Sequence, residues 1–444
     1  MYDLLLRQPF MSGAGLEASR AQALVAAMRE VELALAAEQE AIGLLPAGSA
    51  EAMAPYLGDD AFDMQLLAEE TAKGGNAAIP FVKQAKAALP DDLKRHFHKG
   101  ATSQDIVDSA LIVLLKPRLE RCLSLLAQAR TAGCSLMETH RGTAMVGRTL
   151  MQQALPITFG AKVANWLWGL YQAEQRLGEV ASHGLFVQLG GAVGVHSGLD
   201  EHGLELMDGL ATRLGLNAPL LPWHTDRQPI LALAGALDAV AAGAEKIALD
   251  VALMCQTEVG ELSEPAEAGV GESSSMPHKR NPVACARIRA AARQVHGNAG
   301  IIANAGAQPL ERGLGEWHAE WAPLVDSVLL VEGALETLAK LLEGLEVHGE
   351  AMQRNLAVTG GAIMAEPAAR VLVPAGGSDA AKRIAREAAE TAREQGRPYA
   401  DVLIEHPEVA GKVDESALRD AVRPELYIGS SQAQVERALK VLSD

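Results

Sequence analysis

The chain has 444 residues, of which 49% are hydrophobic and only 4% aromatic, and its formal net charge at pH 7 is -17. An acidic chain without a basic footprint is a poor match for nucleic acid or an anionic membrane, so neither is expected as a partner. A core built mainly from Ala, Leu, Val and Met favours closely packed helices. A chain of this length usually divides into several domains.

The first part of the chain predicts a small domain of short helices over residues 1–104. Residues 18–42 place Met28, Val31 and Leu35 on one face and charged side chains on the other, the pattern of an amphipathic helix. Glycines and prolines punctuate the rest of this domain. The N-terminus shows no cleavage site of small residues and no segment reaches membrane-spanning length, so a cytoplasmic protein is expected.

Residues 105–349 predict a bundle of long helices, and residues 350–444 predict a second small helical domain. Apolar residues recur at three- and four-residue spacing, without strand-like alternation, in 106–137, 155–180, 199–214, 229–264, 282–304 and 322–347. The expected fold class is therefore all-α with three domains. The cysteines lie within helical patterns without close pairs, so buried reduced thiols are expected rather than disulfides or zinc; they are Cys122, Cys134, Cys255 and Cys285.

Polar segments interrupt the helical pattern, and the first of them is HKGATSQD, residues 98–105. Thr102 or Ser103 is suited to cap the helix that starts near Asp105, which leaves backbone N–H groups for an anion. An ordinary helix cap is the alternative. His96 and His98 are spaced as a metal pair, but no third ligand pattern follows, so no metal is expected.

The second segment is GRTLMQQALPITFG, residues 147–160, just before a predicted helix. It combines the guanidinium of Arg148, the hydroxyl of Thr149 and the amides of Gln152 and Gln153. Such groups are able to grip carboxylates through paired hydrogen bonds. An unspecialised loop is the alternative for this segment taken alone.

The third segment is GESSSMPHKRNP, residues 271–282, within an expected catalytic loop over residues 269–282. It is too polar for a core and suits a loop that closes over an anionic substrate. Ser273 is placed to exchange a proton, while Lys279 and Asn281 hold carboxylate oxygens. A weaker fourth segment, residues 311–318, offers Arg312 as a further cation, with a solvated helix end as the alternative.

The three segments resemble, in order and spacing, the three sequence regions of the superfamily of fumarase, aspartase, argininosuccinate lyase and adenylosuccinate lyase. The resemblance runs nearly end to end. Within the superfamily, the chain is most similar to the bacterial 3-carboxy-cis,cis-muconate cycloisomerases. This similarity rests on the segments RTLMQQALP, LGGAVG at 189–194, ERGLGEWHAEW at 311–321 and RPELYIGSS at 423–431.

The resemblance implies a homotetramer with a twenty-helix core, a small polycarboxylate substrate and no cofactor. Each active site takes its three regions from three different subunits. The expected catalytic residues are Ser273, which moves a proton, Lys279 and His140. The expected substrate-binding residues are His98, Thr102, Ser103, Arg148, Thr149, Gln152, Ser274, Met276, Asn281 and Arg312.

The departures from the superfamily pattern lie at three positions. The lyases and fumarase carry R-T-H in the second region, and that His assists the heteroatom that leaves or attacks; here the position is Leu150. In adenylosuccinate lyase a Glu thirteen residues after the loop serine partners this His, whereas thirteen residues after Ser273 stands Ala286. The loop also has Glu272 where the usual pattern has Gly.

An elementary argument links the missing His to the reaction. An amine or hydroxyl group leaves poorly without a proton, and general acid catalysis is worth roughly a hundredfold to ten-thousandfold. A carboxylate, with a reference pKa of about 4, is already ionised at neutral pH and attacks without a base. Taken with this argument, the resemblance to the cycloisomerases implies closure of 3-carboxymuconate to a carboxymuconolactone in protocatechuate breakdown, with Ser273 or Lys279 exchanging the proton and His140 or His98 as alternative carriers. A fumarate-releasing lyase of the adenylosuccinate or argininosuccinate type, or an inactive structural protein on the same scaffold, is the rival.

Overall fold

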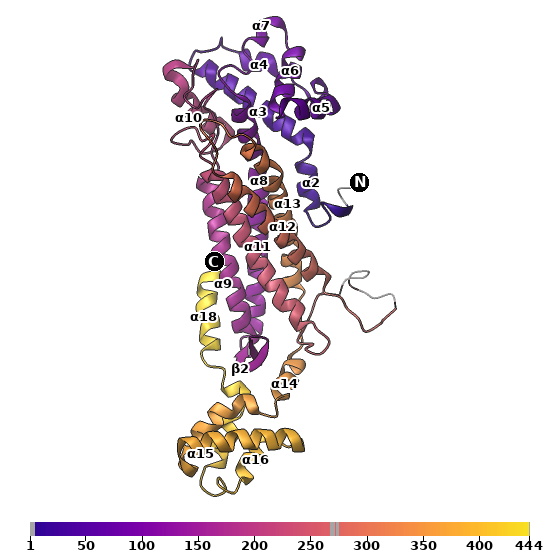
Figure 1. The fold of residues 1–444 in the computed structure, drawn as a ribbon, viewed down its shortest axis with the longest axis vertical. Helices are drawn as coiled ribbons and strands as arrows, with labels where there is room; N and C mark the ends of the chain where they lie inside the picture. Colours follow the sequence, from indigo (N-terminus) through magenta and orange to yellow (C-terminus); the bar gives the residue numbers. More distant parts are fainter. Residues whose placement is uncertain (1–4, 267–270, 272–274, 444) are drawn as a thin grey trace. The chain divides into compact units, whose positions relative to one another are not determined.

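The computed structural model describes residues 5–266, 271 and 275–443. Its fold is helical, as expected from the sequence (Figure 1). Ser273 and Ser274, which were predicted as site residues, and Glu272 lie outside the described residues.

The N-terminal part contains short helices, as predicted. They are α2 (Gly13–Ala18), α3 (Ala21–Ala41), α4 (Ser49–Met53), α5 (Met64–Gly74), α6 (Ala78–Ala88) and α7 (Asp91–Lys94), with the 3-10 turns η1 (Ala54–Tyr56) and η2 (Asp59–Ala61). The apolar face of α3 is buried, with Met28, Val31 and Leu35 each at most 1% exposed. Its amphipathic pattern therefore predicted both the helix and the face that packs.

Five long helices follow, at the places where the sequence repeats apolar residues every three to four positions. They are α8 (Ser103–Thr139), α9 (Phe159–His183), α11 (Gln228–Met254), α12 (Val283–Ala305) and α13 (Glu316–Glu343). The short helices η3 (Asp200–His202) and α10 (Gly203–Leu214) lie between α9 and α11 in the sequence. The prediction of long helices is confirmed.

Between α8 and α9 the chain forms a β-hairpin, which the sequence analysis did not foresee. Strand β1 (Ala144–Thr149) pairs antiparallel with β2 (Gln152–Thr158), and Thr149 faces Gln152 across the turn. The expectation of helix from residue 155 was wrong: residues 152–158 form β2, and β1 is buried at four successive residues, so neither strand shows the regular alternation that marks a strand in sequence. A second, shorter pairing joins β3 (Leu262–Ser263) to β4 (Glu346–Val347).

The C-terminal part is again built from shorter helices. They are α14 (Gly349–Ala357), η4 (Ala362–Met364), α15 (Ala365–Gln395), α16 (Tyr399–Glu405), α17 (Glu415–Ala421), η5 (Pro424–Leu426) and α18 (Ser431–Leu442). Non-helical backbone at Gly376 and Gly377 interrupts α15. Leu372, Ile384 and Leu403 pack in its buried core.

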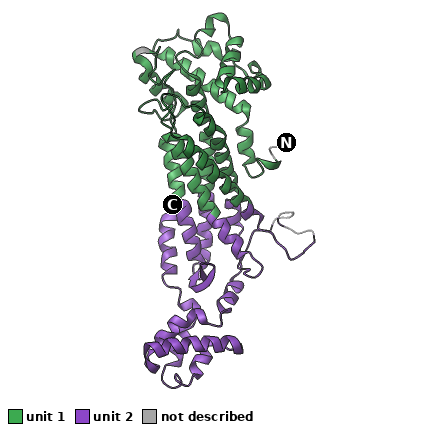
Figure 2. Cartoon of the chain, viewed as in Figure 1, with its two compact units in different colours: residues 1–126, 172–245, 287–337 green, residues 127–171, 246–286, 338–444 purple. Residues whose placement is uncertain are grey.

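The described chain groups into two compact units (Figure 2). Unit 1 comprises residues 1–126, 172–245 and 287–337, and unit 2 comprises residues 127–171, 246–286 and 338–444. Each unit is therefore made of three separate stretches of chain. The division into 1–104, 105–349 and 350–444, which follows the sequence order, stays a prediction.

The burial of the cysteines differs in part from the expectation. All four cysteines are free, as expected, but only Cys122 and Cys285 are buried, whereas Cys134 and Cys255 are half-buried.

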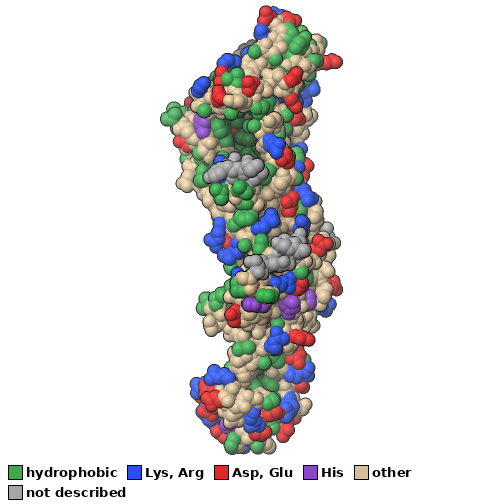
Figure 3. All heavy atoms as spheres, turned by 90° about the vertical axis from the view of Figure 1, so that its right-hand side faces the viewer, with side chains coloured by type: hydrophobic (Ala, Val, Ile, Leu, Met, Phe, Trp, Pro, Cys, Tyr) green, Lys and Arg blue, Asp and Glu red, His purple; other side chains and the backbone are tan. Residues whose placement is uncertain are grey.

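Acidic and basic side chains are interspersed on the face shown in Figure 3. Among the described residues no single helix has the length and apolar composition of a membrane span, although α14 and residues 362–395, bent by 78°, reach the threshold as a pair.

Candidate functional site

The first polar segment is held in unit 1 by one buried carboxylate. Asp105 accepts hydrogen bonds from the backbone N–H groups of Thr102 (2.9 Å), Gly190 (3.0 Å) and Gly191 (2.9 Å), and His224 Nε2 lies 2.7 Å from its Oδ1. Helix α8 begins at Ser103, so Thr102 occupies the N-cap position and Asp105 the third helical position. A side chain there that accepts from the N-cap N–H forms half of a capping box. Asp105 thus fixes the segment that carries the predicted hydroxyls.

Thr102 and Ser103 are half-buried at this helix start. The cation that was predicted to join them, Arg312, already has acceptors: its Nη1 donates to Gln104 Oε1 (2.7 Å) and its Nη2 to the carbonyl of Ala192 (2.8 Å). In this structure Arg312 therefore ties the helix start to the LGGAVG segment. Its predicted contact with substrate stays a prediction.

The second polar segment is the tip of the β1–β2 hairpin in unit 2. Leu150 and Met151 form its two-residue turn with φ of 50° and 65°, the left-handed conformation that hairpin turns of this length need. For residues with a Cβ this costs about 1–2 kcal/mol each. Leu150 is 97% and Met151 68% exposed, and Thr149 and Gln152 on either side are exposed as well. The hairpin thus presents a hydroxyl, an amide and two strained apolar residues.

Arg148, also predicted to bind substrate, forms a two-pronged ion pair inside unit 2. Its Nη1 lies 2.9 Å from Glu261 Oε2 and its Nη2 lies 2.7 Å from Glu261 Oε1. The Glu261 side chain is fully buried, whereas that of Arg148 is 26% exposed, and Asn355 Nδ2 donates to Glu261 Oε1 (2.8 Å). The terminal nitrogens of Arg148 therefore hold the hairpin against the chain segment that leads into β3.

His140 lies at the base of the hairpin, directly after α8. Its Nδ1 is 3.1 Å from Thr143 Oγ1, and its ring meets Phe159 edge-on. Burial lowers the pKa of His140, so the neutral imidazole is favoured. A neutral imidazole is able to accept a proton, but the predicted catalytic role of His140 stays a prediction.

The third polar segment is described at Gly271 and from residue 275 onwards. The N–H of Asn281 donates to the carbonyl of Gly271 (2.9 Å), and Gly271 has a φ of 74°. A Cβ at Gly271 would lie 2.6 Å from the Asn281 carbonyl oxygen, so this position requires glycine on both counts. Lys279 and Met276 are exposed and Asn281 is half-buried.

The ends of this loop are fixed by Glu264, a residue that the sequence analysis did not single out. Its carboxylate accepts from the backbone N–H groups of Ala284 (3.0 Å) and Cys285 (2.8 Å), in the first turn of α12. Arg280 Nη2 donates to the Glu264 carbonyl (2.9 Å). An acidic residue that caps a helix from a distant part of the chain leaves no local sequence signal, which is why it was missed.

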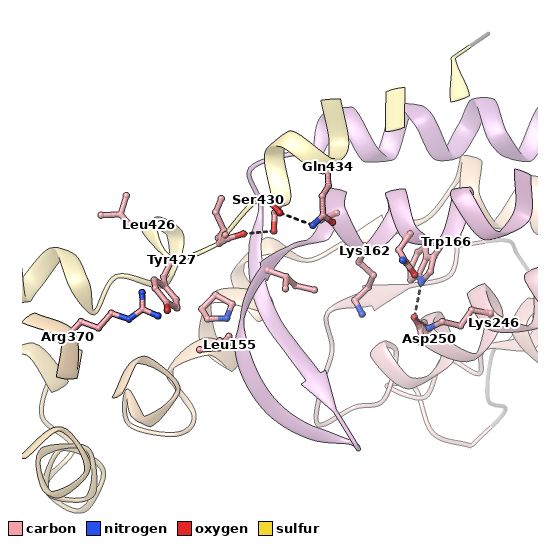
Figure 4. A pocket seen from close by; sticks show the side chains of 17 residues that line it. Leu155, Lys162, Trp166, Lys246, Asp250, Arg370, Leu426, Tyr427, Ser430 and Gln434 are labelled. Carbon is pink, nitrogen blue, oxygen red and sulfur yellow. Dashed lines mark hydrogen bonds and ion pairs between the residues drawn. The ribbon is translucent and has the colours of Figure 1, made fainter. Parts of the chain in front are cut away.

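A cavity of about 800 Å³ lies beside β2 in unit 2 (Figure 4). Lys162, Lys246 and Arg370 line it together with one carboxylate, Asp250, which accepts from Trp166 Nε1 (2.8 Å). Its wall includes residues 426–431, most of the RPELYIGSS segment. None of the predicted site residues that the structure describes lines this cavity. The cavity lies where residues 426–431 meet β2 of the hairpin.

The polar segments between the long helices carry hydroxyls, amides and cations, the groups of a helical enzyme. Residues 8–297 match the family described as "Lyase", and residues 361–438 match the family described as "Adenylosuccinate lyase C-terminus". The chain therefore belongs to the lyase family, within the superfamily of fumarase, aspartase, argininosuccinate lyase and adenylosuccinate lyase.

Two curated relatives and one solved structure are similar to the chain over nearly its whole length. The 3-carboxy-cis,cis-muconate cycloisomerase of Acinetobacter baylyi is 38% identical over 94% of this chain and 94% of its own. The nitrosuccinate lyase of Streptomyces davaonensis is 38% identical over 98% of this chain and 94% of its own. The crystal structure of the 3-carboxy-cis,cis-muconate lactonizing enzyme from Pseudomonas putida has a TM-score of 0.93 at 33% identity and covers 99% of both chains.

Proposed function

We propose that the chain is a cycloisomerase that converts 3-carboxy-cis,cis-muconate into a carboxymuconolactone. The observation that carries this proposal is Leu150, an aliphatic residue 97% exposed at the hairpin tip, where related lyases place a His. A reaction whose nucleophile is an ionised carboxylate needs no imidazole at that position. The similarity to cycloisomerases over nearly the whole chain supports the same reaction.

The reaction is an internal addition in which every atom is conserved. One oxygen of a substrate carboxylate forms a bond to a carbon of the double bond, and the π electrons move toward the neighbouring carboxylate as an enolate-like dianion. A proton then adds to the carbon next to that carboxylate. Ser273 or Lys279 delivers this proton, and Lys279 and Asn281 stabilise the negative charge that develops.

The ion pair of Arg148 changes the part that this residue plays in the proposal. Both terminal nitrogens are held by the buried carboxylate of Glu261, so Arg148 positions the hairpin rather than gripping the substrate. Thr149 and Gln152, exposed on either side of the turn, supply the hairpin's contacts with substrate carboxylates.

We further propose that the enzyme is a homotetramer in which three subunits build each active site. The exposed side chains of Leu150 and Met151 support this, because an apolar turn in left-handed conformation gains stability when another subunit covers it. The expected cytoplasmic location belongs to the same proposal.

A nitrosuccinate lyase is the second candidate, since a relative of that name is 38% identical over 98% of the chain. Nitrite, like a carboxylate, is a weak base that leaves without a proton, so Leu150 is compatible with this reaction too. Lyases that release an amine fit less well, because Leu150 and Ala286 replace the imidazole and its carboxylate partner.

The test offers the purified enzyme four substrates in parallel. Loss of the diene absorbance of 3-carboxymuconate, with the lactone identified as product, supports the cycloisomerase. If the enzyme releases nitrite from nitrosuccinate and does not convert 3-carboxymuconate, the chain is a nitrosuccinate lyase and the cycloisomerase proposal fails. Fumarate release from adenylosuccinate or argininosuccinate, with no lactone formed, overturns both.

A further inference from the structure

Glu32 carries a charge on the buried face of α3, where the helix otherwise presents Met28, Val31 and Leu35 to the core of unit 1. Its side chain is completely buried, and Oε1 lies 2.6 Å from Nδ1 of His98. Its second oxygen, Oε2, accepts no hydrogen bond from any described residue. A buried carboxylate with one unsatisfied oxygen contributes little to stability, and an apolar residue of similar volume would pack at least as well.

The backbone around His98 is held in a conformation that serves this contact. His98 has a φ of 59°, which is strained for a residue with a Cβ, and Gly100 has a φ of 75°. Gln39, two turns after Glu32 on the same face of α3, donates through Nε2 to the carbonyl of Lys99 (2.7 Å), and Lys99 Nζ donates to the carbonyl of Leu44 (2.9 Å). Two residues of helix α3 therefore hold this segment: Glu32 contacts the side chain of His98, and Gln39 donates to the backbone beside it.

The contact with Glu32 uses Nδ1 of the His98 imidazole. The His98 side chain is 17% exposed, and for Nε2 no partner is found among the described residues. His98 also begins the segment that carries Thr102 and Ser103, which Asp105 fixes at the start of α8.

We infer that Glu32 is a positioning residue that orients His98 and keeps it protonated, so that the outer N–H of the imidazolium donates to a carboxylate of the substrate. This inference rests on the proposed function and deepens it, because it assigns a fixed cation to the first polar segment. A charged hydrogen bond of this kind is among the strongest that a protein offers to a carboxylate.

The charges around His98 support protonation. Burial opposes the charged imidazole, but the charge and hydrogen bond of Glu32 on α3 outweigh it, with help from Asp105 on α8 and against Lys86 on α6, and the pKa of His98 is raised. Activity that needs the imidazolium is therefore complete below the pKa of His98 and is lost as the pH rises through it.

The test follows His98 directly and through turnover. Hydrogen–deuterium exchange at the imidazole C2 carbon, read by mass spectrometry of the full-length enzyme from about pH 5 to pH 9, titrates His98 without any substrate. His96 serves as the internal reference. In parallel, kcat/KM for 3-carboxymuconate is measured over the same pH range.

Glu32→Gln is expected to move the exchange curve of His98 and the alkaline fall of kcat/KM to lower pH by the same amount. At neutral pH kcat/KM falls by about tenfold to a hundredfold, the loss expected for one hydrogen bond between charged groups. Glu32→Asp, which keeps the charge, restores part of both. The matched control is Glu332→Gln, because Glu332 is also fully buried in unit 1 but pairs with Arg118 and Ser12; it leaves the exchange curve of His98 in place.

An exchange curve that does not move in Glu32→Gln overturns the pairing itself. A curve that moves while the pH profile of kcat/KM stays unchanged overturns the positioning role. If the unaltered enzyme does not turn over 3-carboxymuconate, the proposed function fails, whereas the exchange curves still decide whether Glu32 sets the charge of His98. Should Glu32→Gln not fold, the comparison of Glu32→Asp with the unaltered enzyme supplies the same two readouts.

Discussion

Substituting Arg148, Glu261 or both tests whether Arg148 anchors the hairpin or binds the substrate. Arg148→Met leaves the carboxylate of Glu261 fully buried with the Asn355 amide as its remaining donor, and breaking a buried pair in this way costs about 3–5 kcal/mol of unfolding free energy. Glu261→Gln costs less, about 2–3 kcal/mol, because the guanidinium of Arg148 is 26% exposed and is partly hydrated.

The double variant Arg148→Met/Glu261→Met decides between the two roles. Replacing a buried ion pair by apolar residues of similar volume is often neutral for stability, so the double variant is expected to unfold near the midpoint of the unaltered enzyme. Asn355 Nδ2 keeps a partner there, since it also donates to the carbonyl of Val259 (2.8 Å). If Arg148 only anchors the hairpin, turnover returns together with stability.

The assay combines urea unfolding at one fixed protein concentration with kcat for 3-carboxymuconate. The matched control is Glu408→Gln, because both carboxylate oxygens of Glu408 accept from Arg383, there from the single nitrogen Nη2 (2.7 and 2.9 Å), while both side chains are more than a third exposed. That change is expected to have a much smaller effect on unfolding. A double variant that folds normally yet stays inactive would refute the anchor and place the Arg148 guanidinium on the substrate.

Three further variants test the hairpin and the loop. Ser273→Ala is expected to lower turnover of 3-carboxymuconate by several orders of magnitude; near-normal kcat removes Ser273 from proton exchange. Gly271→Ala places a methyl group 2.6 Å from the Asn281 carbonyl oxygen at a φ of 74°, so kcat should fall by about tenfold or more, and unaltered kcat contradicts the requirement for glycine. Replacing Leu150 and Met151 by Asn and Gly relieves about 1–2 kcal/mol of backbone strain at each position, and the hairpin is expected to become more stable while kcat falls. A simultaneous loss of stability would show that contacts of the two side chains outweigh the strain.

The sequence by itself determined the helical fold, because apolar residues at three- and four-residue spacing leave a long segment one way to bury them. The start of α8 at Ser103 also followed from a local signal, a cap. The three polar segments and the family were likewise readable, since they depend on residue types at fixed spacing.

The hairpin was missed because its turn uses Leu150 and Met151 in place of the Asn or Gly that usually mark such a turn. The charge of Glu32 at an apolar position of α3 was a signal that the sequence offered, since Glu32 lies four residues after Met28 on the buried face. Its partner, His98, is 66 residues away, and no spacing rule connects the two.

Only the tertiary structure shows which groups the two cations contact. Arg148 and Arg312 have the composition of carboxylate ligands, yet Glu261 and Gln104 occupy them. Local sequence fixes which hydrogen-bonding groups a segment offers, but partners come from distant segments. Burial then settles the pairing, because a charge removed from water must find its partner within the protein.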